Sequence, residues 1–165
     1  MSAWVTDVPS MNGRSTPLQY RFLVAMQGAL GIGANLNHWT DADQSLATKM
    51  IATYKRIRPT IQTGNLYRLI SPTSNNDLAS TEYVSQDGRQ AVVFAFRHSQ
   101  QYNTTVPPLP LRGLNPNATY TLESVDNKLQ DQQTALSGAY LMSHGVTLNL
   151  RGDYDSTAVI LQRQQ

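Results

Sequence analysis

The pattern of apolar and polar positions changes near residue 64, and the two parts of the chain predict different architectures. Up to that point strand-like and helix-like segments alternate, whereas beyond it nearly every apolar segment is short and bounded by turn residues. Apolar side chains that recur every three or four residues are typical of helices, and short apolar runs between turns are typical of strands. The sequence therefore predicts two domains, 1–64 and 65–165.

The first part predicts the order strand, helix, strand, helix. Residues 3–8 form a short apolar segment of strand character, and helical spacing follows over 17–29. A second strand is predicted over 31–36, and a second helix over 40–57. This βαβα order is the unit of a parallel α/β sheet or barrel, but two such units cannot close a (β/α)8 barrel. Since the chain opens directly in an apparent core strand, we expect a fragment of a larger barrel.

The ends of the second helix carry two local signals. Thr40 and Asp43 resemble a capping box, in which a hydroxyl and a carboxylate satisfy the first free N–H groups of a helix. Pro59 is expected to break or restart the helix because it has no N–H to donate. Gly64 is expected to end the segment.

The second part predicts short antiparallel strands. Residues 65–70 read as a strand and residues 73–80 as a polar loop. The clearest hairpin signal is Asp87-Gly88, which lies between the apolar runs 81–85 and 91–96. Further strands are predicted over 120–125, over the alternating positions Val146, Leu148 and Leu150, and over 158–161. Roughly seven short strands at short intervals predict an antiparallel β-sandwich.

Composition narrows the classes of function. The chain has 13 basic and 11 acidic residues, three separated histidines and no cysteine. We therefore expect no metal site, no cofactor, no disulfide and no nucleic-acid partner. No apolar run approaches the ~20 residues that cross a bilayer. Because no signal peptide pattern is recognisable either, we expect no membrane association and a cytoplasmic location.

Two stretches resemble a known family. They are Trp4 to Pro9 followed by Gly13 to Leu18, and the specific run Ala52 to Leu69 with its Tyr-Lys-x-x-Arg-Pro-x-Ile-Gln-x-Gly pattern. Together they are similar to bacterial α-galactosidases (melibiases) of the α-galactosidase and raffinose-synthase group. The segment 29–36 resembles the family's last barrel strand. The resemblance implies the last βαβα units of a (β/α)8 barrel followed by a C-terminal antiparallel β-sandwich.

The resemblance also implies a function for the parent protein. It implies a retaining glycosidase that removes terminal α-linked galactose from melibiose- and raffinose-type oligosaccharides, using two aspartates. In the family the acid/base aspartate lies in an Asp-Asn-Thr-Asp stretch shortly before the segment that matches residue 1, and the nucleophile lies further upstream. Neither motif occurs in this chain, so the chain alone is expected to be inactive, with no catalytic residue of its own. The family usually has a histidine where Trp4 stands, so no substrate contact is carried over. The partners implied are galactosides, the remainder of the barrel and further copies in a homo-oligomer.

Several residues have both a functional and a structural interpretation. Trp4 and Trp39 are the candidate sugar-stacking residues, although packing in the core is preferred for both. Asp7 follows a strand, where barrel enzymes place their chemistry, but a loop carboxylate is preferred. Arg14 is expected to anchor a loop through carboxylate hydrogen bonds, and His38 to be an exposed loop residue.

Two other functions stay open at this point. The predicted β-sandwich is an autonomous carbohydrate-binding module in one, and a structural or oligomerisation domain in the other. The βαβα start argues against a free-standing module, because open parallel edges expose unpaired backbone groups.

Overall fold

The computed structural model describes residues 2–73, 77–102, 104–130 and 135–164. The chain begins with two parallel strands, β1 (Ser2–Thr6) and β2 (Ala29–Gly33), which are joined by helix α1 (Leu18–Ala25). A short 3-10 helix, η1 (Leu36–His38), then leads into the long helix α2 (Asp41–Thr63). The predicted strand–helix–strand–helix order is confirmed, although the second strand ends at Gly33 rather than at residue 36.

Helix α2 starts where the sequence predicted and runs further than expected. The Thr40 hydroxyl accepts the Asp43 N–H at 3.2 Å, and the Asp43 carboxylate accepts the Thr40 N–H at 3.0 Å, which completes the capping box. The expected break at Pro59 is wrong, because the helix continues to Thr63. Pro59 faces solvent, while Ile57 and Ile61 on either side of it are buried. Burial of these neighbours holds both halves of the helix in line despite the missing hydrogen bond.

The second part is a six-stranded antiparallel sheet in the order β3-β4-β5-β8-β6-β7. The strands are β3 (Asn65–Ile70), β4 (Leu78–Val84), β5 (Gln90–Arg97), β6 (Thr119–Ser124), β7 (Ala135–Ser137) and β8 (Asp155–Arg163). The strand at 65–70 and the hairpin around Asp87-Gly88 are confirmed, and the hairpin register runs from Val84↔Ala91 to Leu78↔Arg97. The predicted loop 73–80 is wrong for residues 78–80, which belong to β4, and residues 74–76 lie outside the described residues.

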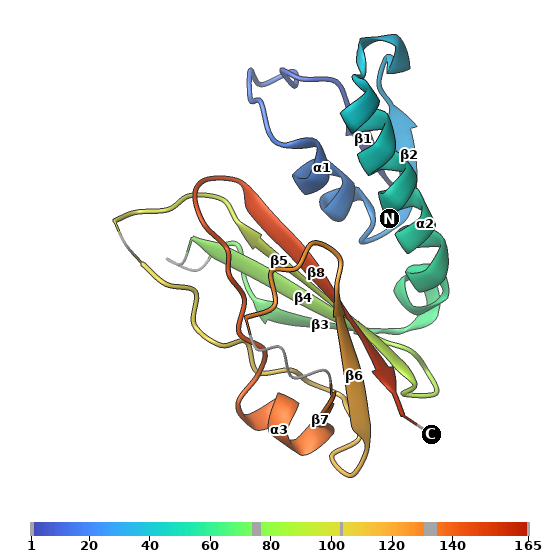
Figure 1. Cartoon of the computed structure of the whole chain (residues 1–165), viewed down its shortest axis with the longest axis vertical. Helices are drawn as coiled ribbons and strands as arrows, with labels where there is room; N and C mark the ends of the chain where they lie inside the picture. The colour runs from blue at the N-terminus through green and yellow to red at the C-terminus, as the bar shows by residue number, and fades with distance from the viewer. Residues whose placement is uncertain (1, 74–76, 103, 131–134, 165) are drawn as a thin grey trace.

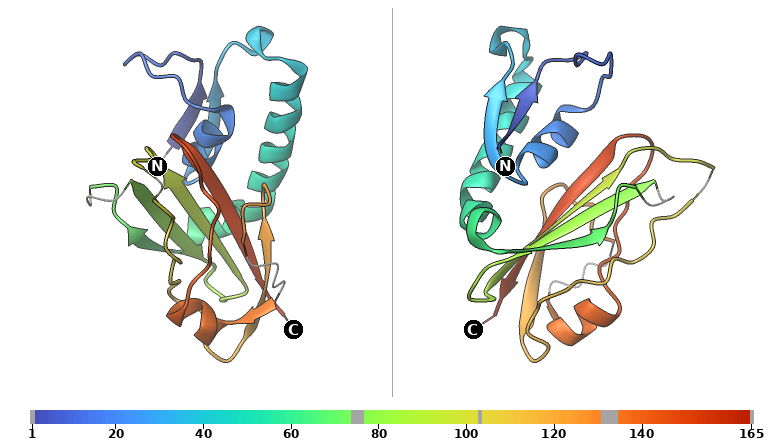
Figure 2. Two further views of the ribbon diagram at one scale, coloured as in Figure 1. Left: turned by 60° about the vertical axis from the view of Figure 1, so that its left-hand side comes forward. Right: turned by 180° about the vertical axis from the view of Figure 1, so that it is seen from behind.

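Two apolar cores lie on opposite faces of this sheet. Helices α1 and α2 cover one face, and helix α3 (Gly138–Ser143) lies beyond the other (Figure 2). The first core joins Phe22 of α1 and Ile57 of α2 to Val92, Phe94 and Ile160 of the sheet. Because this core spans both predicted domains, the packing of residues 1–64 depends on the sheet.

The extended segments that cover the second core do not form a second sheet in the described part of the chain, so the predicted β-sandwich is not complete there. The predicted strand around Val146, Leu148 and Leu150 is not a regular strand, since Val146 and Leu148 pair only through isolated bridges to Leu109 and Leu129. These side chains are nevertheless buried against the sheet together with Leu111. Their alternation reflects burial in an extended layer, which the sequence alone does not distinguish from a second hydrogen-bonded sheet.

Candidate functional site

Trp4 lies on the open face of the two-stranded parallel sheet. Neighbouring side chains of a strand point to opposite faces, so Val5 is buried under the helices while Trp4 is 63% exposed. The Trp4 ring covers Gly31, its register partner, so closely that a Cβ there would lie 2.8 Å from the ring. The expectation that Trp4 packs in the core is therefore wrong, because the covered face of β1 is the one that carries Val5.

Trp39 has a different environment from Trp4. Its ring packs edge-to-face on Phe22 of α1, with 6.2 Å between ring centroids, and belongs to the partly buried margin of the first core. The structure therefore does not bring Trp4 and Trp39 together, since Trp4 faces away from that core. Packing in the core is the role that Trp39 has here.

The carboxyl ends of β1 and β2 meet at one edge, where Asp7, Asn35 and His38 form a polar cluster. The Asp7 carboxylate accepts the Asn35 backbone N–H at 3.0 and 3.2 Å, and the Asn35 amide lies 3.1 Å from His38 Nε2. Asp7 therefore ties the loop after β1 to the loop after β2, as expected for a loop carboxylate. In parallel α/β folds this edge is where ligands bind.

Arg14 does not have the expected role of a carboxylate anchor in the described chain. Its backbone carbonyl accepts the Ser10 N–H at 2.8 Å, and Gly13 N–H donates to Ser10 O at 2.8 Å. This loop is therefore closed by its own backbone rather than by the guanidinium. Asp43 is likewise structural, because its carboxylate belongs to the capping box of α2. The hydrogen bonds from Thr40 lower the pKa of this carboxyl.

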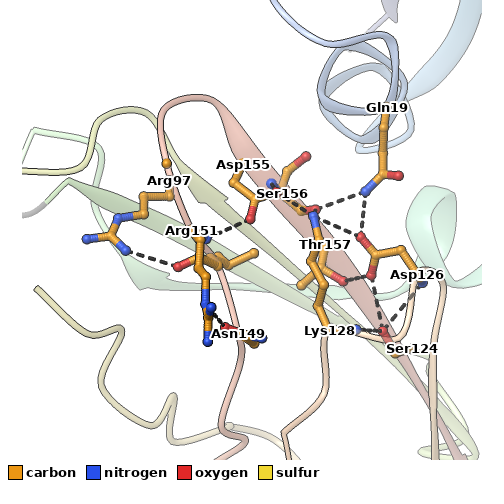
Figure 3. A network of polar contacts seen from close by, with 12 residues as sticks. Gln19, Arg97, Ser124, Asp126, Lys128, Asn149, Arg151, Asp155, Ser156 and Thr157 are labelled. Atoms are coloured by element: carbon orange, nitrogen blue, oxygen red, sulfur yellow. Dashed lines mark hydrogen bonds and ion pairs between the residues drawn. The ribbon is translucent and has the colours of Figure 1, made fainter. Parts of the chain in front are cut away.

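The closest approach to a carboxylate pair lies where α1 meets the sheet. Asp126 and Asp155 both contact the Lys128 ammonium, which Figure 3 shows among them; the distance to Asp126 Oδ2 is 3.2 Å. The Gln19 amide of α1 donates to Asp126 and, at 3.0 Å, to the Ser156 carbonyl. The Lys128 ammonium contacts both carboxylates, which is the arrangement of a structural ion pair, whereas a retaining pair has its two carboxyl groups turned to a bound sugar.

This network is also filled by internal hydrogen bonds. Asp126 accepts from the Thr157 and Ser124 hydroxyls, and Asp155 accepts the Arg151 N–H at 2.7 Å. Neither aspartate lines any of four cavities on the described part of the chain. The network therefore joins α1 to the sheet.

Two buried charges were missed by the sequence analysis. Glu82 on β4 is fully buried, and burial raises the pKa of its carboxyl to about 7. Arg97 at the end of β5 is 3% exposed and donates to the Leu150 carbonyl at 3.0 Å and to the Thr104 carbonyl at 2.8 Å. The sequence does contain a signal for each, because Glu82 is a single charge within a predicted strand and Arg97 directly follows one. The expected sheet residues Tyr83 and Tyr120 are buried, and Tyr67 is partly so.

Metal and membrane sites were also searched in the described ranges. No group of three or more histidine, aspartate or glutamate side chains there is close enough to hold a metal ion. None of the described helices combines the length and the apolar character of a membrane span.

Two family models match successive parts of the chain. The Melibiase model matches residues 1–64, and the model of the glycosyl hydrolase family 36 C-terminal domain matches residues 78–161. The boundary between the two matches falls near the junction of α2 and β3.

Curated relatives align over nearly the whole chain. A protein named "Probable alpha-galactosidase C" from Aspergillus flavus is 34% identical over 166 residues, which is 99% of this chain and 21% of the relative. "Alpha-galactosidase AgaA" from Geobacillus stearothermophilus is 33% identical over 152 residues, which is 92% of this chain and 20% of the relative. The chain thus spans about a fifth of the length of these relatives.

Solved structures agree with these matches. The family 36 α-galactosidase AgaA of Geobacillus stearothermophilus superposes with a TM-score of 0.90 at 31% identity, over 99% of this chain and 22% of that one. The galactosidase domain of AgaSK, an α-galactosidase–sucrose kinase, gives a TM-score of 0.89 at 29% identity, with the same coverage. Because the C-terminal domain model of the family matches just over half of its residues, the chain belongs to glycosyl hydrolase family 36.

Proposed function

We propose that the chain is the C-terminal part of an α-galactosidase, with the end of a (β/α)8 barrel in residues 1–64 and a C-terminal β-sandwich domain in residues 65–165. The observation that carries this proposal is the succession of the two family matches in one chain, Melibiase followed by the family 36 C-terminal domain. The chain would complete the barrel of a longer enzyme and brace it from one side.

The parallel strand pair supports the proposal that residues 1–64 belong to a larger barrel. Within the described residues β1 pairs only with β2, and the face that carries Trp4 has no covering layer. Parallel sheets are normally covered on both faces, so such a pair needs further strands and side chains around it. We infer that these come from the remainder of the barrel, whose interior Trp4 would face.

The reaction we propose for the parent enzyme is retaining hydrolysis of terminal α-linked galactose. That chemistry needs two carboxyl groups about 5–5.5 Å apart, one as nucleophile and one as acid and base. The contacts of Asp126 and Asp155 with Lys128, and of Asp126 with the Thr157 hydroxyl, support a structural role for both aspartates. We therefore place both catalytic aspartates outside these 165 residues and propose that the chain alone hydrolyses nothing.

The substrates we propose are melibiose- and raffinose-type oligosaccharides. A variant of AgaA has been solved in complex with raffinose, and it superposes on this chain with a TM-score of 0.89. We keep a bacterial origin and a cytoplasmic location as parts of the proposal, although the relatives named above include fungal proteins. We also propose a homo-oligomer, which light scattering of the full-length protein at several concentrations would test.

The proposal is tested most simply on the full-length protein. It should hydrolyse an aryl α-galactoside and leave the matched aryl β-galactoside intact. Its sequence should contain an Asp-Asn-Thr-Asp stretch shortly before the segment that corresponds to Ser2 of this chain. A full-length protein that lacks this stretch and cleaves neither galactoside would refute the assignment.

A further inference from the structure

A polar groove lies beside the carboxyl end of β5, away from the parallel strands. It has a volume of about 500 Å³ and continues into a smaller cavity of about 230 Å³ that shares Arg97, Thr104 and Thr105. Its polar lining includes Arg97, Gln100, Thr104, Gln130, Asn149 and Arg151. This volume falls within the range of roughly 300–1,000 Å³ that is usual for ligand sites. Nothing in the proposed reaction uses these residues.

Arg97 forms the buried base of the groove. Its guanidinium donates to the carbonyls of Leu150, Thr104 and, at 3.3 Å, Ser99, and no carboxylate lies within 4.0 Å of it among the described residues. Asp155, its register partner on β8, is held by Lys128 instead. A guanidinium has five N–H donors, and a buried one is retained where its donors are satisfied. Arg97 Nη2 also donates to the Thr104 hydroxyl, so Arg97 is held by four hydrogen bonds and fixes the base of the groove.

The rim of the groove is held in place by hydrogen bonds. Arg151 Nε donates to the Asn149 amide oxygen at 2.8 Å, and Figure 3 shows these two side chains together close to Arg97. The Gln100 backbone N–H donates to the Asp153 carboxylate at 2.8 Å, and the Gln100 amide oxygen accepts the Gly152 N–H. Side chains that are ordered before binding lose less entropy when a ligand arrives.

The charges around the groove balance. Arg97 and Arg151 of the lining are offset by Asp77, which lines the smaller cavity, and by Asp153, which accepts the Gln100 N–H. An anionic ligand would therefore gain little net attraction. Amides, hydroxyls and guanidinium groups instead provide donors and acceptors side by side, which matches sugar hydroxyls because each of these both donates and accepts.

An exposed aromatic ring lies in the loop that carries Gln100 and Thr104. Tyr102 is 93% exposed and belongs to the same loop as Gln100, whose amide donates to the Tyr102 carbonyl at 3.3 Å. A fully exposed tyrosine contributes nothing to the core, but its flat face can pack on the apolar face of a pyranose while its hydroxyl stays in water.

We propose that this groove is a second carbohydrate site, which binds a neutral oligosaccharide without cleaving it. The identity of the sugar, a raffinose-type galactoside, rests on the proposed function, whereas the site itself does not. Strands β1 and β2 lie with α1 and α2 on one side of the sheet (Figure 1), whereas Leu148 and Leu150 of the groove lining belong to the second core on its other side.

The test is a calorimetric titration of raffinose into the 165-residue chain, with amide chemical shifts recorded by NMR. We expect saturable binding in the millimolar range, with shifts at Gln100, Thr104, Gln130 and Arg151. The variants Gln130→Ala and Tyr102→Ala should each weaken binding about two- to tenfold, as expected for one lost hydrogen bond or ring contact. The control Glu123→Gln, which changes an exposed side chain paired with Arg56 of α2, should leave the affinity unchanged.

Three results would overturn the proposal. They are an absence of saturation at tens of millimolar raffinose, shifts confined to the face of Trp4, and tighter binding of galacturonate or inorganic sulfate than of raffinose at the same residues. Failure of the proposed function can be told apart from failure of this proposal, because only the former predicts a full-length protein that does not cleave α-galactosides. Such a protein can still bind raffinose in this groove.

Discussion

The buried carboxyl of Glu82 accepts the backbone N–H of Arg112 at 2.6 Å, and its other oxygen has no partner among the described residues. This one bond ties β4 to the extended layer that covers the second core. Burial outweighs the bond to Arg112, so the pKa of the carboxyl lies at about 7, well above its usual range.

The raised pKa of Glu82 predicts a pH dependence of stability. In the unfolded chain the carboxyl loses its proton near pH 4.5, whereas in the folded chain it keeps it up to about pH 7. The folded state binds more protons in this window, so the free energy of unfolding falls as the pH rises through it, by up to about 3 kcal/mol. Glu82→Gln cannot ionise, and it should be more stable than the parent at pH 8 but similar at pH 4.

Urea denaturation at both pH values measures this difference. Glu123→Gln is the matched control, because it removes an exposed carboxylate whose pairing with Arg56 at 2.7 Å contributes at most about 1 kcal/mol. Equal stability of Glu82→Gln and the parent at pH 8 would mean that the carboxyl is hydrated in the folded protein.

The start of α2 allows a direct test of the capping box. Thr40→Ala removes the hydroxyl that accepts the Asp43 N–H, and it should lower the free energy of unfolding by about 1 kcal/mol. Thr48→Ala is the control, since its exposed hydroxyl only bonds back to Gln44 at 2.9 Å inside the same helix. That second change should be neutral or slightly stabilising, because alanine favours helix. Equal losses would argue against a specific cap.

The first core predicts that the two parts of the chain do not fold independently. A chain of residues 65–165 alone would expose Tyr83, Val92, Phe94 and Ile160, which α1 and α2 cover in the full chain. An apolar face of this kind drives association. The truncated chain should therefore aggregate or bind the dye ANS strongly, whereas the full chain should not. A soluble truncated monomer with a cooperative unfolding transition would contradict the shared core.

The two tryptophans should report their different environments. In Trp39→Phe, the remaining Trp4 should be quenched readily by iodide, because its ring lies over Gly31 on an open face. In Trp4→Phe, the remaining Trp39 should be partly protected by its contact with Phe22. The experiment needs dilute protein, since association through the open face would also shield Trp4. Protection of Trp4 in a monomer would mean that this face is covered by the chain itself.

Local signals in the sequence predicted the elements that depend on their neighbours along the chain. The hairpin at Asp87-Gly88 and the cap formed by Thr40 and Asp43 needed no knowledge of tertiary structure. Pro59 was misjudged because its effect is offset by burial of Ile57 and Ile61, which depends on the sheet. Helix propensity is a weak guide where tertiary packing decides.

The exposure of Trp4 and the network around Lys128 could not be predicted from the sequence, because both depend on tertiary structure. Alternation along β1 establishes that Trp4 and Val5 face opposite ways, but not which face the helices cover. The network joins Gln19 to Asp126 and Asp155 across more than a hundred positions, and no spacing in the sequence indicates such a contact. Only the sheet order, with β8 between β5 and β6, brings these residues together.

The central claim is that the catalytic carboxylates lie outside these 165 residues, and the assay of the chain by itself tests it most directly. The purified, folded chain should release no product from an aryl α-galactoside above the uncatalysed rate, under conditions in which the full-length enzyme turns over. Turnover by the chain that disappears in Asp126→Asn or Asp155→Asn would contradict the account, because it would make the network at Lys128 a reaction centre.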